Sequence, residues 1–103
     1  MRELRKAELE SLGYEKRELV PDDRRKSFYG KALVYSDDTG LEYLVSYETC
    51  VLVRTMGGVY RTWDGWSATT GRHIKAFCGM SKADYMKTPF VAEIASRGGY
   101  HEN

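Results

Sequence analysis

The sequence predicts an α+β domain, in which an antiparallel β-meander of three to four strands is preceded by one helix and followed by two to three. Three observations support this fold class. The middle of the chain is rich in Val, Tyr and Thr and alternates apolar with polar residues, as half-buried strands do. Turn residues interrupt it at short intervals. Helix-capping residues and glycine stops precede and follow it, which places the helices at the two ends of the chain.

The length fits one domain with a core of its own. The chain has 103 residues, and we expect a single domain over residues 1–103. Its expected parts are an N-terminal helix (1–13), the meander (27–63) and a helical part (67–97). Hydrophobic residues make up 42% and charged residues 30%, which is ordinary for a globular protein. The formal net charge of +1 creates no overall field that would attract nucleic acid.

The N-terminal segment Arg2–Leu12 is predicted to be helical, because it carries a narrow apolar stripe among charges and is followed by Gly13. The next segment, Tyr14–Lys26, is polar and contains Pro21, so we expect a loop. A short basic run of this kind is usually solvated, and contact with phosphates is the alternative. The run consists of Arg24, Arg25 and Lys26.

The meander is predicted from four apolar segments separated by turn residues. Asp37–Gly40 and Met56–Gly58 are expected hairpin turns, since glycine tolerates the positive φ that tight turns require. Apolar residues on both faces of the first segment predict a central strand. The third segment is either a separate strand or a continuation of the second, because Tyr47–Thr49 fits both a turn and a bulge. The expected strands are Ser27–Tyr35, Leu41–Tyr47, Cys50–Thr55 and Val59–Trp63.

The helical part begins after the turn signal Asp64-Gly65. Either Ser67 or Thr69 can cap the first helix with its hydroxyl, and Gly79 can end it. Gly71 inside the first turn costs about 1 kcal/mol relative to alanine. We therefore expect another group to pack closely against this glycine.

This first helix has one face that is expected to be buried, and Arg72 and Lys75 lie toward the other side and are expected to be exposed. A second helix is predicted to start near Ser81, which begins a capping-box-like sequence. A third is predicted to start at Thr88-Pro89 and to end before Gly98, with Phe90 on its apolar stripe. The buried face of the first helix comprises Thr70, His73, Ile74 and Phe77.

Catalytic chemistry would depend on His73 as a general base, with Cys50 or Cys78 as a nucleophile beside it. Cys78 lies about 140° around the helix axis from His73, and no third orienting group is evident. We therefore expect a structural histidine and no enzymatic activity, and a Cys–His hydrolase is the remote alternative. The two histidines and two cysteines have no zinc-site spacing, and no phosphate-binding motif is present, so no metal or cofactor is expected.

Two sequence motifs carry a family resemblance. SYETCV at residues 46–51 and WSATTGRHIKAF at residues 66–77 resemble a small domain of unknown function from phages and mobile elements of Firmicutes. Its members resemble the pattern SY-x-T-x-V … YS-x-TT-x-RH-I-x-x-F. The resemblance covers about Tyr29 to Phe77, with Trp66 in place of the commoner tyrosine and Cys50 in a variable slot. It implies a phage or mobile-element origin and no known reaction.

The first functional hypothesis is a binding protein. The chain has eight tyrosines and two tryptophans, and such rings form interface hot spots when they are exposed. The alternative for Trp63 and Trp66 is that they fill the core. With Arg61 expected to face outward, the predicted partner-binding patch consists of Arg61, Trp63, Trp66, Arg72 and Lys75. The context that the resemblance implies favours a host protein or ribonucleoprotein as the partner, and a defence antagonist such as a CRISPR-effector inhibitor as the function.

The alternative is a nucleic-acid-binding accessory protein with a basic sheet face on which bases stack. The near-zero net charge argues against it, since neutralisation of phosphates supplies most of the affinity for nucleic acid. Neither a signal peptide nor a membrane span is evident, so we expect the protein to act in the cytoplasm of a bacterial host. The expected oligomeric state is a monomer or a homodimer. The basic residues concerned are Arg24, Arg25, Lys26, Lys31, Arg54, Arg61, Arg72 and Lys75.

Overall fold

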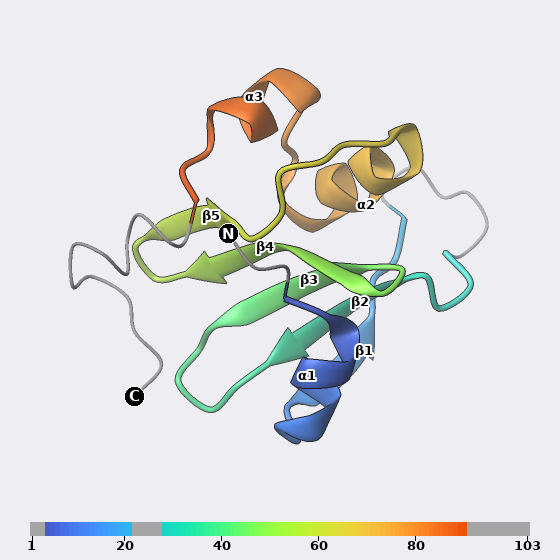
Figure 1. The fold of residues 1–103 in the computed structure, drawn as a ribbon, viewed down its shortest axis with the longest axis vertical. Helices are drawn as coiled ribbons and strands as arrows, with labels where there is room; N and C mark the ends of the chain where they lie inside the picture. The colour runs from blue at the N-terminus through green and yellow to red at the C-terminus, as the bar shows by residue number, and fades with distance from the viewer. Residues whose placement is uncertain (1–3, 22–27, 91–103) are drawn as a thin grey trace.

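The protein is an α+β fold built on an antiparallel sheet of five strands, in a computed structural model that describes residues 4–21 and 28–90. The strands occur in the sheet in the same order as in the chain, from β1 to β5 (Figure 1). The predicted fold class is confirmed, with five strands in place of the three to four expected. The strands are β1 (Glu15–Glu18), β2 (Ala32–Ser36), β3 (Glu42–Ser46), β4 (Thr49–Thr55) and β5 (Gly58–Arg61).

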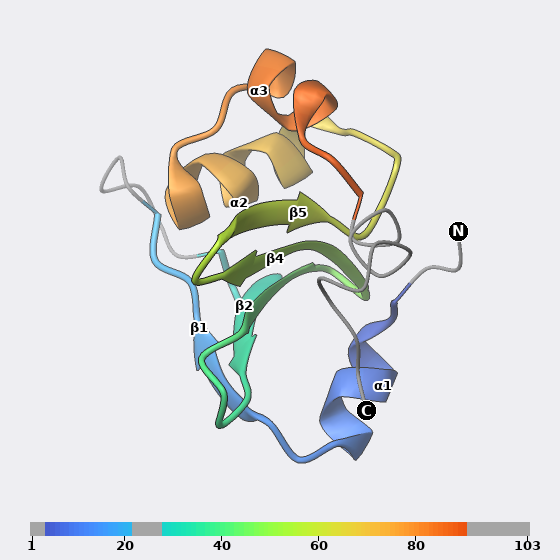
Figure 2. The ribbon, with the colours of Figure 1, turned by 90° about the vertical axis from the view of Figure 1, so that its left-hand side faces the viewer.

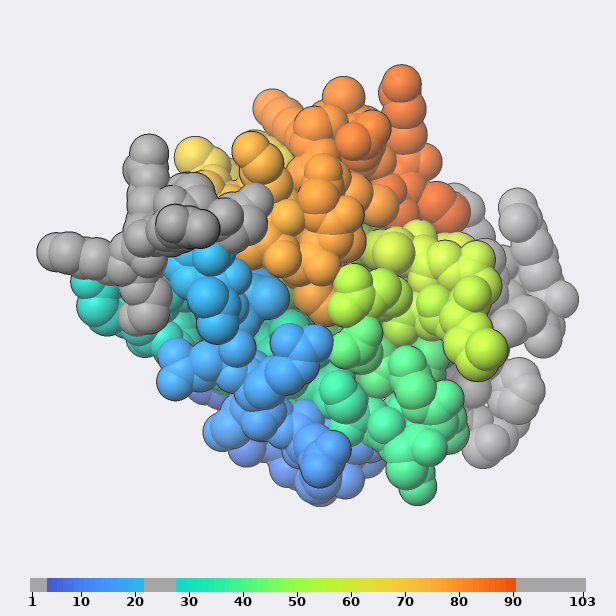
Figure 3. Space-filling view, turned by 180° about the vertical axis from the view of Figure 1, so that it is seen from behind, coloured from blue at the N-terminus to red at the C-terminus, as the bar shows by residue number. Residues whose placement is uncertain are grey.

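The additional strand is β1, which lies in the segment predicted to be a loop. All four of its side chains are exposed and charged, so it lacks the apolar alternation that reveals a half-buried strand. It forms one edge of the sheet and pairs with β2, with Glu15 opposite Ser36 and Glu18 opposite Leu33. Figure 3 shows this segment at the surface in light blue, below α2 in orange. Charged side chains on an edge strand discourage pairing with another chain.

Helices cover both faces of the sheet (Figure 2). The N-terminal helix α1 (Lys6–Ser11) packs on one face, and α2 (Ala68–Cys78) and α3 (Lys82–Lys87) lie over the other. The predicted ends of α2 are confirmed. The Ser67 hydroxyl accepts a hydrogen bond from the Thr70 amide at 3.1 Å, and Gly79 ends the helix with a φ of 79°.

The third predicted helix does not start at Thr88-Pro89. Thr88 has extended backbone angles, and Phe90 forms a parallel bridge with Arg61 at the outer edge of β5. The Arg61 amide donates to the Pro89 carbonyl at 2.8 Å. The chain thus returns to the sheet after α3, and the rest of the predicted helix (91–97) lies outside the described residues.

The sheet is buried on both faces. Strand β2 lies between β1 and β3, which confirms the prediction of a central strand in this segment. The core on the side of α2 and α3 comprises Leu19, Phe28, Ala32, Val34, Leu44, Val51, Leu52, Ile74, Phe77 and Tyr85. The core on the side of α1 comprises Leu9, Leu33, Tyr35, Tyr43, Val45, Cys50 and Val53.

The link between β3 and β4 is a turn, which decides between the turn and the bulge that the sequence left open at Tyr47–Thr49. Tyr47 and Glu48 form this two-residue turn. A register shift between Leu44 and Val45, as in a β-bulge, lies within the strands and not in this link. The N-terminal segment fastens this hairpin from outside. The Cys50 amide donates to the Leu4 carbonyl at 2.7 Å, and the Lys6 amide donates to the Glu48 carbonyl at 2.8 Å.

Candidate functional site

The two halves of the SY … TT-x-RH pattern meet in space at one end of the sheet. Ser46 ends β3, and its hydroxyl oxygen lies 2.8 Å from Nδ1 of His73 and 2.9 Å from the hydroxyl oxygen of Thr70. Both partners come from α2, 24 and 27 residues further along the chain. We call these three side chains the buried polar triad. Sequence reasoning placed Thr70 and His73 on one helix face and missed Ser46 as their common partner.

The buried polar triad is enclosed. The exposed fraction is 1% for His73 and 4% for both Ser46 and Thr70. A serine hydroxyl can donate one hydrogen bond while accepting another, so it can satisfy both neighbours at once. The ring of Phe28 meets the His73 ring edge-on, with centroids 4.6 Å apart. Burial and, to a smaller extent, the charge of Arg72 together lower the pKa of His73 to about 4, so His73 is neutral near pH 7.

A serine beside a histidine is the beginning of a nucleophilic pair, but a nucleophile must reach its substrate. Here Thr70 engages the same hydroxyl, and the core covers both Ser46 and His73. Among the described residues, every fully buried side-chain nitrogen and oxygen has a hydrogen-bond partner. The geometry therefore matches a satisfied core network better than an open catalytic site.

The two cysteines are also engaged elsewhere. Cys50 belongs to the core on the side of α1, and burial raises the pKa of its thiol to about 12. The thiol of Cys78 lies 3.5 Å from the Ile74 carbonyl, and burial raises its pKa as well. Residues 4–21 and 28–90 show no hydrogen bond between either thiol and His73. They also contain no group of three or more His, Cys, Asp or Glu side chains that could hold a metal ion.

The expectation that Arg61 faces outward is wrong. Positions 59, 61 and 63 share one face at the two-residue period of a strand, so Arg61 points toward the helices together with Val59 and Trp63. Its side chain is 8% exposed, and Nε donates to the Thr88 carbonyl at 3.0 Å. The guanidinium also lies 4.0 Å from the centre of the Phe90 ring. Arg61 therefore cannot belong to one exposed patch with Arg72.

The two tryptophans are half-buried and pack against the core on the side of α2 and α3. A Cβ atom placed on Gly71 would lie 2.4 Å from Cζ2 of Trp66, and one placed on Gly65 would lie 2.4 Å from Cζ2 of Trp63. Each ring fills the space over a glycine, which confirms the close packing predicted at Gly71. Arg72 and Lys75 are exposed, as predicted.

Exposed aromatic side chains gather instead above the buried polar triad. Tyr29 is 68% and Tyr47 45% exposed. The β3–β4 turn, the segment 28–31 and the start of α2 lie at one end of the sheet, on the right of Figure 1. The Tyr47 amide donates to the Lys31 carbonyl at 2.8 Å, and the Tyr47 ring lies 5.9 Å from the His73 ring. We call this surface the tyrosine end and define it as Tyr29, Lys31, Tyr47 and Arg72.

The possible nucleic-acid contacts at residues 24–26 lie outside the described residues. The tyrosine end was missed because Tyr29 and Tyr47 were assigned to strands. The signals that could have revealed it are Gly30, which marks a turn, and the turn reading of Tyr47–Thr49.

A family of unknown function, DUF8033, matches residues 15–96. The chain belongs to this family. The matched range includes the whole span of the resemblance, and so it confirms membership of a family without an assigned function. No curated protein and no solved structure matches the chain. The tyrosine end and the buried polar triad of this DUF8033 protein both lie within the matched range.

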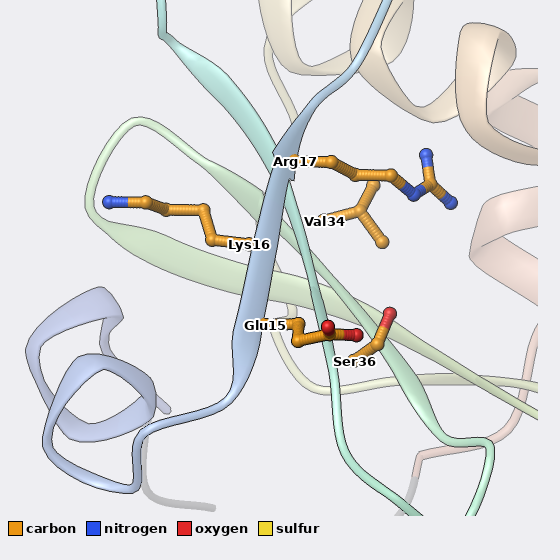
Figure 4. Close-up of a pocket in the computed structure, with 5 residues that line it drawn as sticks. All are labelled: Glu15, Lys16, Arg17, Val34 and Ser36. Atoms are coloured by element: carbon orange, nitrogen blue, oxygen red, sulfur yellow. The ribbon is translucent and has the colours of Figure 1, made fainter.

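A second surface feature of the DUF8033 protein is a shallow hollow on β1 and β2, lined by Glu15, Lys16, Arg17, Val34 and Ser36 (Figure 4). Figure 4 shows Lys16 pointing away from the side to which Arg17 points. Arg17 pairs with Glu42 at 2.9 Å, and Glu42 also pairs with Arg54 at 2.7 Å. Because these charges already pair with each other, they offer little free charge to a ligand. None of the described helices is long and apolar enough to cross a membrane.

Proposed function

We propose that this DUF8033 protein is a non-catalytic binding protein and that its partner is another protein. The observation that supports this function is the layering at the end of the sheet: Ser46 and His73 are enclosed, while Tyr29 and Tyr47 above them are exposed. Tyrosine and arginine side chains are enriched at protein interfaces. Tyrosine offers a large contact area with few rotatable bonds, and arginine offers a planar fork of hydrogen-bond donors. A buried hydroxyl and imidazole contribute stability without contacting a substrate.

The class of partner follows from the resemblance to phage and mobile-element proteins. It favours a host protein or ribonucleoprotein, with inhibition of a defence system, such as a CRISPR effector, as the biological role. The near-neutral net charge supports a protein rather than bare nucleic acid, since electrostatic attraction to phosphates is weak at +1.

The test is affinity purification from a lysate of the host, with and without nuclease treatment. We expect one dominant protein partner that survives nuclease treatment and binds with weak dependence on salt. A turnover that is abolished by His73→Ala in a correctly folded variant would contradict the non-catalytic function.

Binding of nucleic acid is the second candidate, and the observation that favours it is Lys31 beside the exposed Tyr47 ring, with the exposed Arg72 over Phe28 nearby. If it is correct, affinity for a single-stranded oligonucleotide should fall steeply with salt, with a log–log slope of about −0.7 for each phosphate neutralised. A steep slope, together with no protein partner after nuclease treatment, would replace the first candidate by the second.

A further inference from the structure

We propose that the tyrosine end is the partner-binding surface and that it receives an acidic segment of the partner protein. This inference rests on the proposed function, in which the partner is a protein. Two independent observations carry it: the backbone geometry of the two tyrosines, and the positive charge beside them that no carboxylate of the described residues pairs with.

The first tyrosine occupies a turn position that favours another residue. The Lys31 amide donates to the Phe28 carbonyl at 2.9 Å, which closes a four-residue turn with Tyr29 and Gly30 at its centre. Their φ values are 54° and 75°, and two positive φ values define a type I′ turn. Asn-Gly is the favoured sequence for this turn. Tyr29 adopts a costly conformation there, and 68% of its side chain remains exposed.

The second tyrosine has the same conflict in the neighbouring turn. Tyr47 has a φ of 61°, and Glu48 after it is not among the described residues with positive φ. A two-residue hairpin with positive φ at its first position alone is a type II′ turn, which favours glycine at that position. Tyr29 and Tyr47 are the non-glycine residues of positive φ within the described ranges. Both are tyrosines, both are exposed, and their turns are hydrogen-bonded to each other through Lys31.

Backbone strain at an exposed side chain indicates a use for that side chain, because folding alone would be better served by asparagine or glycine. Buried residues recover such a cost through contacts, but the exposed parts of these rings do not. An interface would recover it, since burying a tyrosine ring against a partner removes apolar area from water and satisfies the hydroxyl at the rim. The two turns thus point to a binding surface.

The charge beside the rings indicates the chemistry of the partner. The Lys31 ammonium lies 5.5 Å from the centre of the Tyr47 ring, and the Arg72 guanidinium lies 5.3 Å from that of Phe28. Neither cation has an ion pair within residues 4–21 and 28–90. Carboxylates of a partner segment would complement both charges. Several other cations on the sheet are already paired with carboxylates: Lys16, Arg17 and Arg54.

A protein segment fits this surface better than a nucleic-acid strand does. Phe28 and His73, which continue the row of rings from Tyr47, are buried and cannot stack on bases. Two described cations would neutralise few phosphates, whereas they are sufficient to orient a short acidic segment.

The experiment selects binders from a displayed random-peptide library, using the parent protein as bait, and then measures the selected peptides on variants. We expect enrichment of Asp and Glu in these peptides. The double variant Tyr29→Asn/Tyr47→Gly should bind them at least about tenfold more weakly. Its thermal midpoint should equal or exceed that of the parent, because each substitution introduces the residue that its turn favours. The double variant Lys31→Glu/Arg72→Glu should also lose binding, because the reversed charges repel the acidic residues of the peptides.

Matched controls separate this surface from general exposure and charge. Met56→Ala removes a fully exposed side chain from the β4–β5 hairpin, and Lys82→Glu reverses an exposed charge on α3. Both should bind the selected peptides as the parent does. A loss of binding in these controls that equals the loss in the double variant would overturn the assignment.

Other outcomes also overturn the inference. These are an absence of enrichment, peptides without acidic bias, and peptides that bind the double variant as tightly as the parent. Displacement of the peptides by oligothymidylate at equal or lower concentration would assign the surface to nucleic acid. If a host protein recovered by affinity purification still binds the double variant, this surface is wrong while the proposed function stands. If the protein instead shows a His73-dependent turnover, the proposed function itself fails.

Discussion

Three arginines of the described residues lie over phenylalanine rings, and two of them, Arg61 and Arg72, do so in contrasting regions. Arg61 lies 4.0 Å from the centre of the Phe90 ring, beside α3, and Arg72 lies 5.3 Å from that of Phe28, above the buried polar triad. Arg61 is buried and donates to the Thr88 carbonyl. Arg72 is exposed, and no hydrogen bond or ion pair within the described residues engages its guanidinium.

The comparison shows that a cation beside a ring does not by itself indicate a binding site. An arginine whose N–H groups are satisfied inside the protein joins elements of the fold. Arg61 does so between β5 and the end of α3. An arginine whose donors no described residue engages, such as Arg72, has the chemistry that our proposal assigns to partner binding. The same residue type therefore has a structural role in one region and a proposed binding role in the other.

The largest expected effect separates the two arginines by stability. Arg61→Ala should lower the free energy of unfolding by about 2–4 kcal/mol, because it leaves the Thr88 carbonyl without its partner and removes packing against Phe90. Arg72→Ala should change it by less than about 0.5 kcal/mol. Urea unfolding of both variants measures the difference. Equal losses would contradict the contrast between the two regions.

The next effect concerns acid sensitivity in the region of Arg72. The pKa of His73 lies at about 4 in the folded protein against an ordinary value of 6.5, so between these pH values the unfolded chain binds a proton that the folded protein does not. Stability is therefore fully present above pH 6.5 and should fall toward pH 4, by up to about 3 kcal/mol. Urea unfolding across this range should show the loss, and His73→Asn should reduce it. An unchanged slope in the variant would assign the acid sensitivity to other groups.

The smallest effect concerns the contact that joins the two regions. The Trp66 ring packs over Gly71, next to Arg72, and lies 5.6 Å from the ring of Tyr85 in the region of Arg61. Gly71→Ala should lower stability by about 1 kcal/mol, because overpacking against Trp66 outweighs the better helix propensity of alanine. In a Trp66→Ala background the same change should stabilise the protein. A double-mutant cycle measures this change of sign, and additive effects would exclude the contact as its cause.

Helix α2 could be predicted from the sequence because its signals are local. Ser67, Gly79 and the apolar period between them all lie within one short segment. The β4–β5 hairpin was predicted for the same reason, from Met56 and the glycines after it. Strand β1 was not, because its exposed charged residues carry no alternation and its strand conformation depends on pairing with β2.

The candidate site was less accessible to sequence reasoning because it depends on contacts between distant segments. Ser46 meets His73 from 27 residues away, and no local pattern encodes that contact. The family pattern contains both residues but does not state that they touch. The position of Arg61, in contrast, follows from a local rule. The two-residue period of a strand places Arg61 on the same inner face as Val59, and the prediction of an outward side chain overlooked this period.

The order of the strands has a consequence for how the chain reaches its fold. Each of the four strand pairings joins neighbours in the chain. Three of them close short turns at a small cost in chain entropy, and the pairing of β1 with β2 closes the longer connection 19–31. Such local pairing is typical of rapid folding. Two hydrogen bonds depart from it: Cys50 to Leu4, and Arg61 to Pro89. These bonds fasten the two ends of the described chain to a sheet that already exists, so amide labelling during refolding should protect the hairpins first and these two amides last.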